Sequence, residues 1–168
     1  TGELAISFSN QGYNVTGIDL DPEMIRMATK KTATDQPNPR FRTGNMMGIE
    51  EMYEAESFDR VLCFGNTLVH LDSSEQIGNF LNSVHRLLRK SGSFIFQIVN
   101  YDQILLGQHN ELPPIKRGEL IFSRGYRLAN RKIYFKGTLQ KGKELIASQE
   151  QLLYPLTSSE LTKLFSLS

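Results

Sequence analysis

Residues 13–24, with the sequence YNVTGIDLDPEM, decide the fold, because they set a short buried strand directly before a helix. The first half, ending at Asp19, predicts the strand. Asp21 is suited to cap the helix, and Pro22 fits its first position. Glu23 adds a negative charge at the positive end of the helix dipole. This stretch therefore predicts one strand–helix unit of an α/β protein.

The alternation of strand and helix extends to both sides of this stretch. Leu4, Ala5 and Phe8 predict a short helix that Gly12 closes as the residue after its last turn. A short strand is expected around Phe41, after a polar loop. The chain thus predicts a helix before the central strand and a second strand after it.

Two further strands flank the clearest helix of the sequence. Residues 58–64 (FDRVLCF) and 93–99 (SFIFQIV) predict the strands, and Ser73 with Gln76 forms a capping-box pattern before the helix. Residues 89–92 (RKSG) are expected to end it. Its apolar positions fall at helical spacing: Ile77, Phe80, Leu81, Val84, Leu87 and Leu88. Strands separated by helices predict right-handed crossovers and a mostly parallel sheet.

The pattern changes after Asn100. Residues 120–128, 132–139 and 143–154 predict three strands joined by short turns, which form an antiparallel meander. Residues 157–160 (TSSE) then form a second capping-box pattern, which predicts a final helix. We therefore expect an antiparallel insertion between a parallel sheet and a return helix.

The composition excludes several classes of function. The chain has 168 residues with 39% hydrophobic and 22% charged residues, which suits a packed core. Its one cysteine, Cys63, excludes an internal disulfide framework and a cysteine-built zinc site. Net charge is −3 over residues 1–100 and +4 over residues 101–168, which is far from a nucleic-acid footprint. No signal peptide or membrane-spanning run is visible, so we expect a cytoplasmic protein with no membrane partner.

A glycine before the first helix and an acid at the end of the next strand are typical of nucleotide sites. Gly2 and Asp19 hold these two positions. In doubly wound folds the glycine turn lets a ligand approach the backbone, and the acid accepts hydrogen bonds from ribose hydroxyls. Nicotinamide-dependent oxidoreductases use the same pair, and an aspartate at a strand end is also an ordinary turn residue. These two residues alone do not decide between another nucleotide-binding enzyme, a nicotinamide-dependent oxidoreductase and an ordinary turn.

Five motifs follow one another in the sequence: 1–5 (TGELA), 17–24 (GIDLDPEM), 41–46 (FRTGNM), 58–71 (FDRVLCFGNTLVHL) and 87–93 (LLRKSGS). In this order they resemble the tail of the glycine motif, the second motif, the adenine loop, the fourth-strand motif and the following turn of class I S-adenosylmethionine-dependent methyltransferases. The meander with Arg124, Tyr126 and Tyr134 resembles the lid of small-molecule methyltransferases, including glycine and sarcosine N-methyltransferase-like proteins. The resemblance implies an α/β fold with a doubly wound, Rossmann-like, mostly parallel sheet and an inserted antiparallel meander as a lid. It also implies S-adenosylmethionine as the cofactor.

The resemblance implies a role for each matching position. Gly2 would lie under the methionine part of the cofactor, and Asp19 would bind the ribose diol. The other expected cofactor-binding residues are Thr1, Leu20, Met24, Asn45, Met46, Phe64, Gly65 and Asn66. Asn45 stands where aspartate is commoner, so it would accept from the adenine amino group without charge assistance.

The acceptor side is expected after the later strands. His70 is a candidate general base, with a structural histidine as the alternative, and Tyr101 is a second catalytic candidate. Asn100, Arg124 and Tyr126 are the expected acceptor contacts; cross-strand pairing within the sheet is the alternative for the last two. No metal ligands are expected.

The resemblance also predicts the domain organisation. Residues 1–102 would form the cofactor-binding core, 103–156 the lid, and 157–168 the start of a return helix. Family members begin with a further central strand and end with an antiparallel strand pair. We therefore expect the chain to be part of a longer protein.

The function expected from these features is methyl transfer from S-adenosylmethionine to a small-molecule acceptor by in-line displacement. A non-catalytic binding or regulatory module with the same fold is the alternative, and an NAD(P)-dependent oxidoreductase is a further one. The expected partner is a small molecule and not a nucleic acid.

Overall fold

The computed structural model describes residues 1–32, 39–108, 110–129 and 132–167. The chain forms two compact units, Thr1–Ser57 and Phe58–Ser168. Each unit is described by itself below. The domain boundaries expected from the sequence stay predictions.

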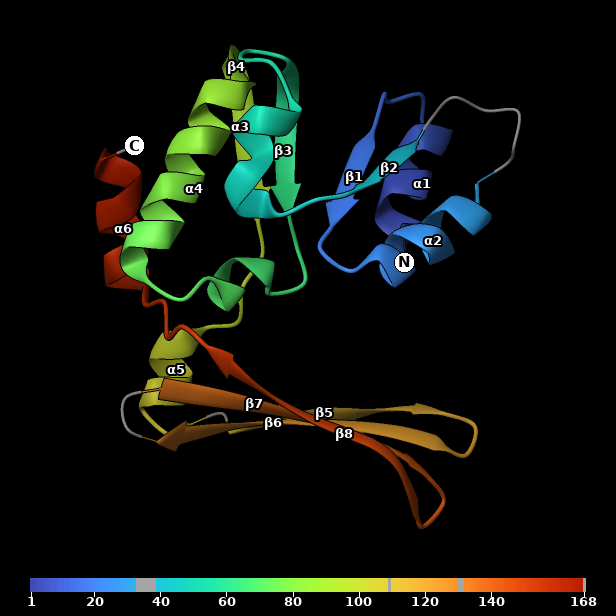
Figure 1. Cartoon of the computed structure of the whole chain (residues 1–168). Helices are drawn as coiled ribbons and strands as arrows, with labels where there is room; N and C mark the ends of the chain where they lie inside the picture. Colours follow the sequence, from blue (N-terminus) through green and yellow to red (C-terminus); the bar gives the residue numbers. More distant parts are fainter. Residues whose placement is uncertain (33–38, 109, 130–131, 168) are drawn as a thin grey trace. The chain divides into compact units, whose positions relative to one another are not determined.

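The first unit alternates helices with two parallel strands (blue to cyan in Figure 1). Its elements are α1 (Glu3–Asn10), β1 (Thr16–Asp19), α2 (Pro22–Lys30), β2 (Arg40–Thr43), the 3₁₀ helix η1 (Met46–Gly48) and α3 (Ile49–Met52). β1 pairs with β2 from Thr16 opposite Arg40 to Asp19 opposite Thr43. The carboxyl ends of both strands therefore lie at one edge of this pair.

Local side-chain chemistry sets the helix ends as the sequence predicts. Asp21 caps α2, because its Oδ1 accepts from the Glu23 N–H over 2.8 Å, and proline holds the first helical position. α1 ends before Gly12, whose φ of +89° is the left-handed conformation typical of a residue after a helix. Both predicted helix boundaries are confirmed.

The second unit joins a parallel strand pair to an antiparallel sheet. Its elements are β3 (Phe58–Cys63), the 3₁₀ helix η2 (Thr67–His70), α4 (Ser74–Leu87), β4 (Leu88–Phe96), α5 (Tyr101–Leu105), β5 (Glu111–Arg117), β6 (Leu120–Ala129), β7 (Lys132–Lys141), β8 (Glu144–Leu153) and α6 (Ser158–Leu167). β3 and β4 run parallel. α4 and α6 lie side by side against this pair (Figure 1).

The apolar stripe of α4 forms the core of this part of the unit. Its buried residues are Ile77, Phe80, Leu81, Val84 and Leu87. The Phe80 ring meets Phe94 of β4 edge-on at 6.0 Å between centroids, and Phe165 of α6 stacks on Phe96 at 5.6 Å. The helix predicted from apolar spacing is therefore confirmed, and it covers one face of the strand pair.

The capping box before α4 is confirmed with one change. The Gln76 N–H donates to Ser73 Oγ over 3.2 Å, as the pattern predicts. The Gln76 side chain reaches back to the N–H of Asp72 instead of that of Ser73. The reciprocal bond has therefore moved by one residue, from the Ser73 N–H to the Asp72 N–H.

The end of α4 differs from the prediction. The helix stops at Leu87 and β4 begins at Leu88, whereas residues 89–92 were expected to form a separate turn. The register moves from Phe58 opposite Leu88 to Arg60 opposite Ser93, so these four residues form an irregular stretch within the strand. Arg89 bonds Asp59 across this irregularity over 2.7 Å.

The insertion is a sheet of four antiparallel strands in the order β5-β6-β7-β8. The three predicted strands correspond to β6, β7 and β8, and β5 was missed. Pro113 and Pro114 lie in β5 and argue against a strand in the sequence. Proline is tolerated here because β5 is an edge strand, and its pairing shifts register between Leu112 and Ile115.

Candidate functional site

Asp19 is the last residue of β1, and its carboxylate is exposed. Its Oδ1 accepts from the Asp21 N–H over 2.9 Å, which fixes the turn into α2. Leu20 follows with 70% of its surface exposed. The carboxyl end of this parallel strand thus presents an acid beside an apolar side chain.

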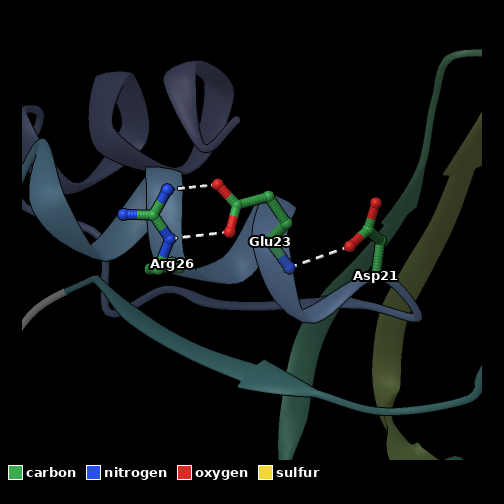
Figure 2. Close-up of polar contacts among 3 residues, drawn as sticks. All are labelled: Asp21, Glu23 and Arg26. Atoms are coloured by element: carbon green, nitrogen blue, oxygen red, sulfur yellow. Dashed lines mark hydrogen bonds and ion pairs between the residues drawn. The ribbon is translucent and has the colours of Figure 1, made fainter.

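The other two acids of this stretch serve the helix. Figure 2 shows that Asp21 accepts from the Glu23 N–H, while the Glu23 carboxylate pairs with Arg26 through two hydrogen bonds. The bond from Arg26 lowers the pKa of Glu23. Asp19 is therefore the acid of this stretch best placed to meet a ligand at the strand end.

Two glycines let the first helix and strand approach Phe41 closely. A Cβ on Gly2 would lie 2.7 Å from the Ala28 Cβ and 2.9 Å from the Phe41 ring. A Cβ on Gly17 would also lie 2.9 Å from that ring. Gly2 has a φ of +81° as well, so both its backbone conformation and its surroundings require glycine.

Thr1 and Glu3 form a polar cluster with Lys31 in front of α1. The Glu3 carboxylate accepts from the Lys31 ammonium and from the Thr1 hydroxyl. Mainly because of Lys31, the pKa of Glu3 falls to about 2. Thr1, an expected cofactor contact, is therefore engaged with Glu3 in this structure.

Asn45 caps η1. Its Oδ1 accepts from the Met47 N–H over 3.0 Å. A carbonyl oxygen has a second lone pair, so a further donor fits on the same atom. Met46 is half-buried, and Met24 on α2 is partly exposed. The roles expected for these three residues stay predictions.

The loop after β3 has an unusual backbone at Gly65 and Asn66. Their φ angles are +75° and +66°, both in the left-handed region. The Gly65 N–H donates to Gln97 Oε1 over 3.1 Å, and the Asn66 N–H donates to the Gln97 carbonyl over 3.2 Å. Gln97 was not singled out from the sequence, because its partners lie about thirty positions earlier and no local pattern marks it.

Asn66 connects this loop to the start of α5. Its Oδ1 accepts from the Val99 N–H over 3.1 Å, and its Nδ2 donates to the Tyr101 phenol oxygen over 2.8 Å. Tyr101 is only 1% exposed, and burial raises its pKa well above the ordinary value. At neutral pH its hydroxyl is therefore protonated, so it can donate a hydrogen bond and cannot act as a base.

Tyr101 also contacts the antiparallel sheet. Its ring meets Tyr126 of β6 edge-on at 6.3 Å, and Tyr126 packs on Phe135 of β7. Burial raises the pKa of Tyr126 too. The structure thus brings together three of the expected site residues, Asn66, Tyr101 and Tyr126, which come from three different segments.

Arg124 lies on the same face of β6 as Tyr126, two residues earlier. Its Nη2 donates to the Pro113 carbonyl over 3.1 Å, and its guanidinium lies 5.9 Å from the centre of the Phe122 ring. Its Nε is buried and has no hydrogen-bond partner among the described residues. This donor is therefore shielded from solvent in the structure.

The remaining expected residues are placed differently. Asn100 caps α5 through a bond from the Gln103 N–H, so it opens a helix, and the strand predicted over residues 93–99 ends at Phe96. His70 is the last residue of η2, and desolvation lowers its pKa. Cys63 is buried in β3, which raises its thiol pKa to about 11.

The basic residues of the meander are divided between its two faces. Arg124 stands opposite Gly137, whereas Arg127 covers the Tyr134 ring at 4.3 Å and pairs with Glu150. Lys136 lies on the face of Arg127. Of the basic residues Arg124, Arg127, Arg131, Lys132 and Lys136 in this part of the sequence, Arg131 lies outside the described residues.

The described part of the chain holds no group of three His, Cys, Asp or Glu side chains arranged to bind a metal ion. Among these residues, no helix has the length and apolar character needed to cross a membrane.

Two N-methyltransferases are similar in sequence to most of this chain. Rat (Rattus norvegicus) glycine N-methyltransferase is 25% identical over 151 residues, which cover 84% of this chain and 46% of that enzyme. Glycine/sarcosine N-methyltransferase of Parasynechococcus marenigrum is 27% identical over 114 residues, covering 64% of this chain and 38% of the relative. The chain thus spans less than half the length of these curated relatives.

Solved structures show the same fold. The CcbJ methyltransferase of Streptomyces caelestis superposes with a TM-score of 0.79 at 16% identity, covering 99% of this chain and 67% of that one. The amino pentose methyltransferase CalS10 of Micromonospora echinaspora, solved with S-adenosylmethionine bound, gives 0.67 at 15% identity, covering 96% and 68%. These likenesses confirm the expected Rossmann-like α/β fold with an antiparallel insertion.

The family comparison covers the first unit and the part of the second unit from β3 through α4. The family described as "Methyltransferase domain" matches residues 1–92, which is more than half of the 168 residues. That span contains the strand-end acid, the glycine before α1 and the Gly65–Asn66 loop. The chain therefore belongs to the methyltransferase domain family.

Proposed function

We propose that the intact protein transfers the methyl group of S-adenosylmethionine to a small-molecule acceptor, at a nitrogen, an oxygen or a carboxylate. The observation that carries this proposal is Asp19, an exposed carboxylate at the carboxyl end of a parallel strand, followed by the exposed side chain of Leu20. A carboxylate at this point of a doubly wound sheet binds ribose hydroxyls. The family assignment supports the same chemistry.

The residues present fit this cofactor. Leu20 and Met24 offer exposed apolar surface to the adenosine, and Asn45 offers a carbonyl oxygen with a second lone pair. Gly2 would lie under the methionine part, Thr1 would also contact the cofactor, and Met46 would pack beside the adenine. Phe64, Gly65 and Asn66 would line the floor between cofactor and acceptor. When bound, S-adenosylmethionine supplies a methyl carbon on a positively charged sulfur.

The acceptor would be held by Asn100, Arg124 and Tyr126. Support comes from the place of Arg124 on the same face of β6 as Tyr126, because a guanidinium donates well to a carboxylate. The names of the relatives, glycine and glycine/sarcosine N-methyltransferases, agree with an acceptor that carries a carboxylate. An amino acid or a similar small anion is therefore the first class to test.

The chain's chemical task is chiefly alignment and exclusion of water, since an in-line displacement needs the nucleophile, methyl carbon and sulfur in one line. A neutral amine acceptor needs no base. For a protonated acceptor, His70 is the candidate, because its lowered pKa leaves the imidazole neutral at pH 7. Tyr101 would position the acceptor by donating its phenol hydrogen.

Calorimetry of the intact protein with S-adenosylmethionine and with NADH tests the cofactor. We expect binding of the first and none of the second. Binding of NADH alone would instead support an oxidoreductase. Methyl-labelled cofactor should then be offered with a panel of glycine, sarcosine, an amino sugar, a catechol and a small carboxylic acid. Cofactor binding without transfer to any acceptor would favour a regulatory module.

Two variants on one sheet face test the acceptor site. Arg124→Ala and Tyr126→Phe should raise the KM for the acceptor and leave cofactor affinity within about twofold of the unaltered protein. Arg127→Ala, on the opposite face, is the matched control. We also expect negligible binding of tRNA or duplex DNA near physiological salt, because the basic residues do not form one stripe. A tight, salt-sensitive complex would contradict a small-molecule acceptor.

A further inference from the structure

Gln97, the residue after β4, binds the last residue of β3 and two residues of the loop that follows β3. Its backbone N–H donates to the Cys63 carbonyl over 3.0 Å, and its own carbonyl accepts from the Asn66 N–H over 3.2 Å. Its side-chain Oε1 accepts from the Gly65 N–H over 3.1 Å. The first two bonds need only a backbone, whereas the third depends on the glutamine side chain.

The Gln97 side chain accepts its hydrogen bond at Gly65, where the backbone conformation is unfavourable without support from neighbouring groups. Gly65 and Asn66 both have positive φ angles, and asparagine is one of the few residues besides glycine that adopts this conformation routinely. Neighbouring contacts must hold two such residues in succession. The Gln97 carboxamide provides one of these contacts directly at Gly65.

The conformation of this turn determines where the Asn66 side chain points. In the structure its Oδ1 reaches the Val99 N–H and its Nδ2 reaches the Tyr101 oxygen. Because the Tyr101 oxygen accepts this bond, its hydrogen must point elsewhere. Tyr101 also packs edge-on against Tyr126. A connected series of contacts thus runs from Gln97 through Gly65 and Asn66 to the buried tyrosines.

We infer that Gln97 is a positioning residue for methyl transfer. Through the Gly65 amide it holds the left-handed turn, and through Asn66 it sets the direction in which Tyr101 donates. This inference rests on the proposed function, in which Phe64, Gly65 and Asn66 line the floor between cofactor and acceptor. Gln97 acts on the reaction through this turn and is not itself a catalytic residue.

Three variants of the intact protein separate positioning from general stability. Gln97→Met keeps the length of the side chain and removes the acceptor, Gln97→Glu restores an acceptor oxygen, and Gln151→Met is a control on exposed β8. Gln97 is exposed, so we expect all three to fold with nearly unchanged Tm. Readouts are the hydrogen exchange of the Gly65 amide, S-adenosylmethionine affinity, and kcat and KM for the fastest acceptor of the panel above.

In Gln97→Met we expect exchange of the Gly65 amide to speed up about three- to tenfold, the range that corresponds to one lost neutral hydrogen bond. We expect kcat to fall by a similar factor, with cofactor affinity within about twofold and recovery of most activity in Gln97→Glu. If Gln97→Met matches the Gln151→Met control in exchange and kcat, the inference is wrong while the proposed function stands. The inference is also wrong if kcat falls only in proportion to a lower Tm and Gln97→Glu does not restore it.

Calorimetry of the unaltered protein distinguishes a failure of this inference from a failure of the proposed function. If it binds no S-adenosylmethionine in calorimetry, the proposed function is wrong, and the positioning role is wrong with it.

Discussion

The carboxylate of Asp102 caps a helix that begins 56 positions further along the chain. Its Oδ2 accepts from both the N–H, over 3.0 Å, and the hydroxyl of Ser158, the first residue of α6. Asp102 lies in the first turn of α5, before the four-stranded sheet, and α6 follows that sheet. One carboxylate therefore joins the two points at which the chain enters and leaves the insertion.

This link makes stability depend on pH. The bonds from Ser158 lower the pKa of Asp102 below its ordinary value. A carboxyl with a depressed folded-state pKa stabilises the fold above its unfolded-state pKa, and this contribution is lost as pH falls through the folded-state pKa. We expect Asp102→Asn to lower the Tm at pH 7 and to differ less from the unaltered protein at pH 3. Thermal unfolding followed by circular dichroism across this range measures both effects. An equal difference at both pH values would contradict the assignment.

Removing the phenol oxygen of Tyr101 should destabilise the protein. Tyr101→Phe keeps the ring contact with Tyr126 and leaves the Asn66 Nδ2 without its acceptor. We expect a loss of about 1–3 kcal/mol in the free energy of unfolding, the usual effect of an unsatisfied, partly buried donor. Urea denaturation measures it. Tyr134→Phe, whose ring stays under Arg127, is the control and should change stability by less than about 0.5 kcal/mol.

Cys63 should be nearly inert toward alkylation. Burial raises its thiol pKa from 9.0 to about 11. Two pKa units reduce the thiolate fraction at pH 8 about a hundredfold, and the side chain is also shielded. We expect iodoacetamide to modify the folded protein at least about a hundredfold more slowly than the protein in urea, as followed by mass spectrometry. Fast modification of the folded state would show that β3 opens readily.

Alanine substitutions at two glycines with similar φ angles distinguish the cost of backbone strain from the cost of overpacking. Gly2 and Gly12 both have positive φ, but a Cβ on Gly2 would overlap Ala28 and Phe41, while nothing lies within 4 Å of one on Gly12. We expect Gly12→Ala to cost about 1–2 kcal/mol from backbone strain alone. Gly2→Ala should cost about 1–3 kcal/mol more, because it adds overpacking. Equal losses in chemical denaturation would mean that the close approach at Gly2 relaxes freely.

Asp19→Ala should weaken cofactor binding in the intact protein. If Asp19 holds the ribose diol, its loss removes charge-assisted hydrogen bonds that contribute about 1.5–3 kcal/mol. Calorimetry should then show about a ten- to hundredfold weaker affinity for S-adenosylmethionine. Glu54→Ala, a change of an exposed acid in the same unit, should have no effect. Unchanged affinity in the Asp19 variant would remove Asp19 from the site.

The features that the sequence predicted well depend on residues close together in the chain. The caps at Asp21 and Ser73 bond residues two or three positions ahead, so a short pattern contains both partners. The strands β3 and β4 each contain a short apolar run, which is also a local signal. The family resemblance rested on the same kind of local motif.

The features that the sequence did not predict depend on distant partners. The link between Gln97 and Gly65 spans 32 positions, and the Asp102–Ser158 link spans 56. Neither residue type signals such a bond by itself. β5 was missed for a different reason, because its two prolines contradict a strand unless the strand is known to lie at an edge.

Those two prolines have a consequence for the behaviour of the protein at high concentration. An edge strand exposes unpaired backbone groups that recruit strands from other molecules, which is a common route to aggregation. Pro113 and Pro114 carry no N–H, and the local register shift bends the pairing beside them. The β5 edge therefore offers a poor template for a foreign strand. β5 thus helps to keep neighbouring molecules from joining their sheets along that side.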